Sequence, residues 1–255
     1  MSGTPAFQDA NPTSSLADSR EIAHFNTLAA TWWDPNGPMK PLHRINPVRL
    51  GHIKQDFASH FGREARAMKP FEGLRLLDIG CGAGLVAEPL AKMGFTVTGI
   101  DLAEENIAIA RHHAEAQGIP VEYRASAIET LPLDAPFAAI TLLEVVEHVP
   151  DVSAFVREAA LRLKPGGMLI ASTLNRTLKA YALAIVGAEY VLRWLPRGTH
   201  DWAKFVTPAE LEAHMEAAGL VPQSRQGMVF NPLADAWRLS SDCDVNYFIT
   251  ATKPA

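Results

Sequence analysis

A regular alternation of short apolar runs and helical patterns fills residues 73–252, and it constrains the fold more than any other feature. Seven apolar, β-rich runs are typical of strands and cover residues 73–79, 95–100, 121–124, 137–143, 168–172, 220–226 and 245–252. Helical patterns lie at residues 83–93, 104–117, 151–163 and from 207 onward. This alternation predicts an α/β fold in which a mostly parallel, seven-stranded sheet carries helices on both faces.

Short turn and cap signals mark the boundaries of these elements. Gly94 and Gly118 follow helical patterns, at positions where glycine commonly ends a helix. Thr207, followed by Pro208 and Glu210, has the composition of a helix-starting capping box. The Lys-Pro-Gly-Gly run at 164–167 predicts a turn before the fifth strand.

The first strand ends in a glycine bend, which we define as residues 78–84 (Asp-Ile-Gly-Cys-Gly-Ala-Gly). Gly80, Gly82 and Gly84 allow the backbone to approach a ligand closely, and the following helix offers free N–H donors. Asp101 ends the second strand, where a carboxylate can accept hydrogen bonds from both ribose hydroxyls. The bend and Asp101 together predict a nucleotide-type cofactor at the carboxyl ends of these strands.

Two cofactors fit the glycine bend. Residues 82–87 match the G-x-G-x-x-A pattern of a dinucleotide site. The alternative is S-adenosylmethionine, which has a carboxylate, an ammonium and a sulfonium but no pyrophosphate. Asp78 suits the cationic groups and would repel a pyrophosphate, so the sequence favours S-adenosylmethionine. An empty glycine-rich turn is the third interpretation, and the presence of Asp101 disfavours it.

A second cluster of polar residues follows the fourth strand. Glu144, Glu147 and His148 are spaced so that their side chains converge if a helix begins there. Two carboxylates and an imidazole can hold a hard divalent cation such as Mg²⁺. The alternative is that the segment lies along the cofactor without a metal, with His148 as a base or a packing group. The local sequence leaves both interpretations open.

Several motifs resemble a known family. Residues 78–84, 98–101, 144–148 and 164–167 resemble the class I S-adenosylmethionine-dependent methyltransferases, whose fold is Rossmann-like. Longer and more specific stretches resemble the ubiquinone biosynthesis O-methyltransferase family, over about residues 20 to 253; they are residues 32–35, 40–49, 172–176, 186–190, 196–201 and 244–247.

The resemblance implies an activity and a set of site residues. Members methylate a phenolic hydroxyl of two polyprenyl catechols, 2-polyprenyl-6-hydroxyphenol and 3-demethylubiquinol. The cofactor contacts of the family correspond here to Arg44, Gly80, Asp101 and Leu143. The metal ligands correspond to Glu144, Glu147 and His148. Without the resemblance, Arg44 would be interpreted as part of a surface salt bridge.

The general base has two candidates. If no metal binds, His148 or His200 is placed to remove the phenol proton. His200 lies in the sequence Gly-Thr-His-Asp at 198–201, and its alternative role is to cap a turn there.

An apolar insertion spans residues 178–203, between the fifth strand and the helix that begins near 207. Residues 178–195 form a helical pattern with Lys179 and Arg193 among apolar and aromatic residues. A polyprenyl tail stays in the bilayer, because each buried CH₂ contributes ~0.8 kcal/mol. We therefore expect the insertion to be a lid that touches the membrane surface; the alternative is a core helix packed on the sheet.

Composition and the chain's first residues bound the remaining classes. The net charge is −5, which disfavours a nucleic-acid partner, and two cysteines indicate a reducing compartment. Residues 1–20 lack an apolar run and predict a disordered tail ahead of a single domain at 21–255. We expect a cytoplasmic enzyme peripherally associated with the inner membrane, in contact with other enzymes of its pathway. A dehydrogenase, another small-molecule methyltransferase and a non-catalytic cofactor-binding subunit are the alternatives.

Overall fold

The computed structural model describes residues 16, 22, 31–182, 202–231 and 233–255. Apart from residue 16, the tail predicted for residues 1–20 lies outside the described residues, and so does most of the inserted segment, including His200. The division into a tail and one domain stays a prediction.

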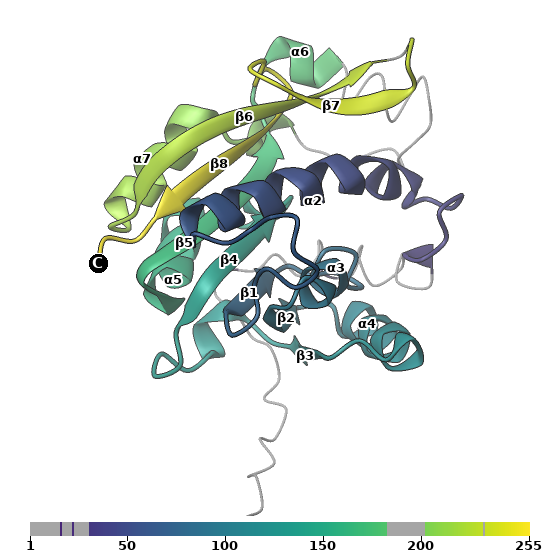
Figure 1. Cartoon of the computed structure of the whole chain (residues 1–255). Coiled ribbons are helices and arrows are strands. Elements are labelled where there is room, and N and C mark those ends of the chain that lie inside the picture. The colour runs from purple at the N-terminus through teal and green to yellow at the C-terminus, as the bar shows by residue number, and fades with distance from the viewer. Residues whose placement is uncertain (1–15, 17–21, 23–30, 183–201, 232) are drawn as a thin grey trace, which may run out of the picture.

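The described strands form one sheet, in the order β3-β2-β1-β4-β5-β8-β6-β7 (Figure 1). Their bounds are β1 Arg75–Ile79, β2 Thr96–Asp101, β3 Val121–Ala125, β4 Phe137–Leu143, β5 Leu163–Leu174, β6 Val221–Asn231, β7 Ala236–Ser240 and β8 Asn246–Thr252. The α/β prediction is confirmed, but the count of seven strands is wrong because β7 adds an eighth. β7 was missed because all five of its residues are exposed or half-buried, so no apolar run marks it.

The first five strands are parallel, so their carboxyl ends meet at one edge of the sheet. β1 has β2 on one side and β4 on the other, which makes the β1–β4 boundary the point where strand order reverses. Ligands of open α/β sheets bind at this point, outside the carboxyl ends. β8 is antiparallel to β5, so its first residue, Asn246, pairs with Leu174 at the same edge.

Helices cover both faces, as predicted. One apolar core joins the sheet to α2 (Lys40–His60), α3 (Ala87–Lys92) and α4 (Glu104–Gln117). A second core joins the opposite face to α5 (Val152–Arg162) and α7 (Pro208–Ala217). α2 also contacts β7 and β5, and Figure 1 shows it crossing in front of the sheet beneath the β6–β7 hairpin. None of the helices in the described part of the chain has the length and apolar character needed to cross a membrane.

Local signals located most boundaries. Gly118 ends α4 in the left-handed conformation (φ 64°), and Thr207 and Glu210 form both hydrogen bonds of the capping box. The helix predicted for 83–93 begins only at Ala87, because the glycine bend extends further than expected. The turn predicted for 164–167 lies inside β5, where Gly166 (φ 70°) donates its N–H to the Lys253 carbonyl at 2.9 Å.

Candidate functional site

The glycine bend connects β1 to α3 and is tied to the end of β2. The N–H groups of Gly80 and Cys81 donate to the Ile100 carbonyl, at 2.8 and 3.0 Å. Gly80 and Gly82 have positive φ values of 68° and 52°. A Cβ at Gly82 would lie 2.5 Å from the Trp32 ring, and one at Gly80 would lie 2.4 Å from the Val145 side chain. The bend therefore needs glycine for its conformation and for its close packing.

Asp101 holds the bend in place through both carboxylate oxygens. One oxygen accepts from the Gly82 N–H and the other from the Ala103 N–H, each at 2.8 Å. Burial raises the pKa of Asp101, while these backbone hydrogen bonds act to lower it. Each carboxylate oxygen has a second lone pair, which can accept a ribose hydroxyl as the sequence predicts.

Asp78 is buried at the end of β1 and has one unpaired oxygen. Its Oδ1 accepts from the Thr141 hydroxyl at 2.7 Å, while Oδ2 has no hydrogen-bond partner among the described residues. Burial raises the pKa of Asp78 to about 7, against the opposing effect of the Thr141 hydrogen bond and the Arg49 charge. A buried carboxylate with a free oxygen fits the cationic end of S-adenosylmethionine and does not fit a pyrophosphate.

A tryptophan pair covers the outer side of the bend. Trp32 donates its indole N–H to Asn106 at 2.9 Å, and Trp33 donates to the Ala83 carbonyl at 3.1 Å. The Trp33 ring also stacks on His113, with 3.5 Å between the ring centroids. Both tryptophans lie in a stretch that carries the family resemblance, but no role was predicted for them. Two adjacent tryptophans outside any predicted strand were a usable signal of packing, because such large rings are usually buried against another element.

The second predicted cluster follows β4, where Glu144 has a positive φ of 54°. Its Oε1 accepts from three side chains: Arg49 at 3.0 Å, Ser172 at 2.9 Å and Asn246 at 3.1 Å. A non-glycine residue in this conformation persists only when its surroundings hold it there. α2, β5 and β8 thus each contribute one donor to a single carboxylate oxygen at the sheet edge.

Glu147 and His148 belong to a short 3-10 helix, η3 (Val146–His148). Glu147 is buried and accepts from the Thr173 hydroxyl at 2.7 Å. Burial, and next the nearby charge of Glu144, raises the pKa of Glu147 to about 7. His148 is half-buried. The residues predicted for this site therefore lie together, but in different environments.

The predicted metal site is not supported by this arrangement. Among the described residues, no three or more His, Cys, Asp or Glu side chains are grouped so that they could hold a metal ion. The physical reason is that Glu144 already accepts three hydrogen bonds and Glu147 is buried against Thr173. Glu144, Glu147 and His148 do not fit a divalent cation here.

The remaining predicted residues are placed as follows. Leu143 ends β4, buried and paired in register with Ser172. Arg44 lies on α2, and its guanidinium contacts Asp235 and the Phe230 ring of the β6–β7 hairpin rather than the glycine bend. Its predicted cofactor role stays a prediction, and the contact with Asp235 matches the salt-bridge alternative.

Arg49, Ser172 and Asn246 are site residues that sequence reasoning missed. All three lie in stretches that carried the family resemblance, but none received a role. Arg49 was missed because α2 was not predicted, since Pro41 and Pro47 interrupt its pattern. Asn246 was missed because its place at the edge depends on the antiparallel register of β8.

Comparisons with known proteins agree with this geometry. The family model described as "Methyltransferase domain" matches residues 50–224. The magnesium protoporphyrin IX methyltransferase of Synechocystis, solved with bound S-adenosylhomocysteine, shares the fold with a TM-score of 0.62 at 18% identity, covering 91% of this chain and 94% of that one.

Curated relatives are much closer in sequence. The chain is 56% identical to the ubiquinone biosynthesis O-methyltransferase of Paramagnetospirillum magneticum, over 93% of this chain and 95% of the relative. It is 55% identical to the protein of the same name from Azorhizobium caulinodans, over 93% and 94% of the two chains. With its glycine bend, and with Asp78 and Asp101 at the expected strand ends, the chain belongs to the ubiquinone biosynthesis O-methyltransferase family of S-adenosylmethionine-dependent enzymes.

Proposed function

We propose that this chain methylates a phenolic hydroxyl of polyprenyl catechols in ubiquinone biosynthesis. The acceptors are 2-polyprenyl-6-hydroxyphenol and 3-demethylubiquinol, as the family resemblance implies. The observation that carries the proposal is the 56% identity to a relative of that name over 93% of the chain. The polar groups gathered around Glu144, next to the cofactor residues, support it by providing a place for an aromatic diol.

The chain's own residues bind and align the two reactants. The glycine bend and Asp101 hold the adenosine part of the donor, and Asp78 pairs with its cationic end. S-adenosylmethionine supplies an electrophilic sulfonium methyl group when bound. The site must align the acceptor oxygen within about 3 to 3.5 Å of that carbon. The oxygen–carbon bond forms as the carbon–sulfur bond breaks, which yields a methyl ether and S-adenosylhomocysteine.

His148 is the proposed acceptor of the phenol proton. A phenol has a pKa of about 10, so it needs a base at neutral pH. Within the predicted trio, Glu144 is held by three donors and Glu147 is buried against Thr173. His148 is half-buried and carries an imidazole, the side chain suited to take up a proton at neutral pH. His200, the other candidate, lies outside the described residues.

A methyl-transfer assay tests the function. Purified protein, labelled S-adenosylmethionine and short-chain demethylubiquinol should yield the labelled methyl ether. His148→Gln should lower kcat about 10²-fold or more without changing cofactor affinity, since general-base catalysis contributes 10²–10⁴-fold. Transfer to an unrelated small molecule but to no catechol would contradict the proposal, and an unchanged kcat in the variant would remove the base role from His148.

The same assay addresses the metal. The proposed reaction uses no metal, because Glu144 and Glu147 already accept hydrogen bonds from Arg49, Ser172, Asn246 and Thr173. Adding EDTA and then Mg²⁺ measures the dependence directly. A strict requirement for Mg²⁺ would mean that Glu144 exchanges its protein donors for a cation.

We also propose that the ends of the inserted segment contact the membrane surface. Leu178 is 81% exposed, Tyr181 46% and Trp202 37%, and the two aromatic rings lie 6.4 Å apart between centroids. Exposed apolar and aromatic side chains suit an interface of lipid and water. Such contact would give the enzyme access to lipid-embedded acceptors at the cytoplasmic face of the inner membrane; association with other pathway enzymes stays a prediction.

Flotation with anionic liposomes tests this contact. Replacing Leu178, Tyr181 and Trp202 together by serine should lower recovery of the protein with the liposomes, because the exposed apolar area is removed. Leu133→Ser is the matched control, since Leu133 is 55% exposed but precedes β4, at the opposite edge of the sheet. Equal recovery of all variants would refute the contact.

A further inference from the structure

Arg49 and Asn246 flank Glu144 and are both almost completely buried, at 5% exposure each. Arg49 comes from α2 and Asn246 from the start of β8, so the two residues lie far apart in the chain. Both donate a hydrogen bond to the same oxygen of Glu144, at 3.0 and 3.1 Å, so their side chains lie next to each other. Arg49 is also near Asp78, because its charge acts to lower the pKa of that carboxyl.

Each of these two side chains also has a polar atom without a partner. Arg49 Nε and Asn246 Oδ1 are buried and make no hydrogen bond among the described residues. An unsatisfied buried group costs about 1–3 kcal/mol, so such atoms call for a partner. The two atoms are of opposite kind: an N–H donor on Arg49, and an acceptor on Asn246, whose amide nitrogen already faces the Glu144 carboxylate.

We propose that Arg49 and Asn246 read the two adjacent oxygens of the acceptor and so select a catechol over a monophenol. This inference rests on the proposed function. Arg49 Nε donates to the oxygen that attacks the methyl carbon and favours its anionic form. Asn246 Oδ1 accepts a hydrogen bond from the neighbouring hydroxyl, which keeps its proton. A monophenol lacks that hydroxyl and would leave Asn246 Oδ1 unpaired.

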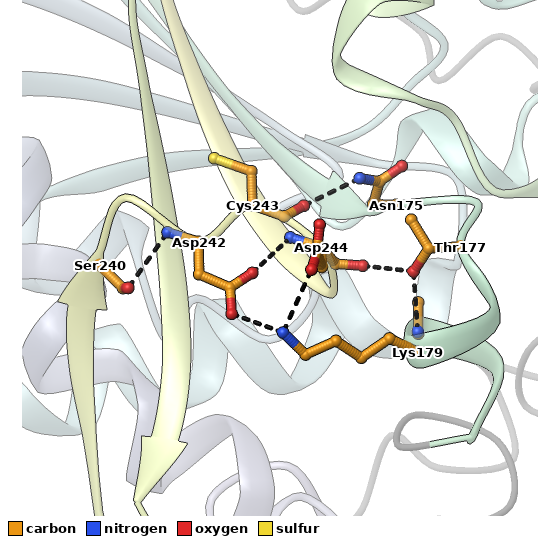
Figure 2. A network of polar contacts seen from close by, with 8 residues as sticks. Asn175, Thr177, Lys179, Ser240, Asp242, Cys243 and Asp244 are labelled. Atoms are coloured by element: carbon orange, nitrogen blue, oxygen red, sulfur yellow. Dashed lines mark hydrogen bonds and ion pairs between the residues drawn. The ribbon is translucent and has the colours of Figure 1, made fainter.

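The loop just before β8 is tied by polar contacts to the residues that follow β5 (Figure 2). Asn175 donates to the Cys243 carbonyl at 2.9 Å, and the Thr177 hydroxyl donates to the Asp244 carbonyl at 2.6 Å. Lys179 pairs with Asp242 and Asp244 on the outer side of this network. Asn246 begins β8 two residues after Asp244, and its own side chain is oriented by the hydrogen bond to Glu144. A polar group with a fixed orientation rejects a ligand that lacks the matching group, because it is left unpaired.

Binding measurements on two acceptors test the inference. Calorimetry on the full chain saturated with S-adenosylhomocysteine compares a short-chain 2-prenyl-6-hydroxyphenol with 2-prenylphenol. We expect the wild-type protein to bind the catechol about tenfold more tightly, the effect of one unpaired hydrogen-bonding group of about 1.4 kcal/mol. Asn246→Leu should bring the ratio close to one through loss of catechol affinity alone.

Arg49→Lys gives an independent readout. Lysine keeps the charge that pairs with Glu144 but has no Nε–H at the guanidinium position. We expect kcat/KM for the catechol to fall about tenfold or more, while the Kd for S-adenosylmethionine changes less than twofold. An equal loss of cofactor and acceptor binding would indicate a purely structural role and overturn the assignment.

Thr250→Val is the matched control for Asn246→Leu. Thr250 lies on the same strand, is equally buried and donates to Asp56 rather than to Glu144. It should lower stability and leave the catechol-to-phenol ratio unchanged. A ratio unchanged in Asn246→Leu, or equal loss of both acceptors there, overturns the inference. Failure of the wild-type protein to methylate any catechol would instead defeat the proposed function.

Discussion

Two halves of the sheet edge are built in different ways. The cofactor half consists of the glycine bend and Asp101, at the ends of β1 and β2. The acceptor half, named for its proposed role, consists of Glu144 with its donors Arg49, Ser172 and Asn246. The cofactor half joins residues about 20 positions apart through backbone contacts, as adjacent parallel strands permit. The acceptor half joins side chains from four distant elements, so its specificity can change while the cofactor half stays the same.

The largest expected effect concerns Trp32, which packs on the glycine bend of the cofactor half and should not affect the acceptor half. Trp32→Ala should lower the free energy of unfolding by about 3 kcal/mol, because a buried indole packed on Gly82 is removed. Urea denaturation measures the change, and the Kd for a catechol in the S-adenosylhomocysteine complex should stay the same. A loss below about 1 kcal/mol would mean that the Trp32 ring contributes little to the fold.

The next effect is confined to the cofactor. Asp101→Ala should raise the KM for S-adenosylmethionine about 10²-fold. The substitution removes the carboxylate that would accept the ribose hydroxyls, and it also removes the acceptor of the Gly82 and Ala103 N–H groups, which anchors the bend. Steady-state kinetics should show an unchanged KM for the acceptor. If both KM values rose together, the two halves would not be independent.

A smaller effect depends on pH. Burial gives Asp78 a pKa of about 7, so the group is neutral well below that pH and anionic above it. Because the anion pairs with the cationic end of the donor, the KM for S-adenosylmethionine should fall about tenfold between pH 6 and pH 8. Asp78→Asn should give a weaker and flat profile. A wild-type profile already flat over this range would disprove the role of Asp78.

The smallest effect concerns the support of the acceptor half. Lys179→Ala breaks an exposed ion pair and should cost less than about 1 kcal/mol of stability. Asn175→Ala removes a hydrogen bond from a buried side chain and should cost about 1–3 kcal/mol. Thermal unfolding of both variants gives the order, and the reverse order would contradict the assigned burial.

The positions of the cofactor-half residues could be predicted from the sequence, whereas in the acceptor half only that of Glu144 could. Asp78, Gly80 and Asp101 lie at strand ends that the apolar runs mark directly, so their meeting follows from parallel topology. Glu144 was found for the same reason, but its partners were not. The hydrogen bonds of Arg49 depend on a proline-containing helix, and that of Asn246 on an antiparallel register; neither leaves a periodic signal in the sequence.

The antiparallel placement of β8 affects how the chain folds during synthesis. β8 lies between β5 and β6 in the sheet, although it follows both of them in the chain. Until residues 246–252 have been synthesised, the side of β5 that faces away from β4 has no strand to pair with. Its backbone N–H and C=O groups can then pair with other chains. β8 therefore both covers the open side of β5 and brings Asn246 to Glu144, so one strand protects the sheet and supplies a residue of the proposed acceptor site.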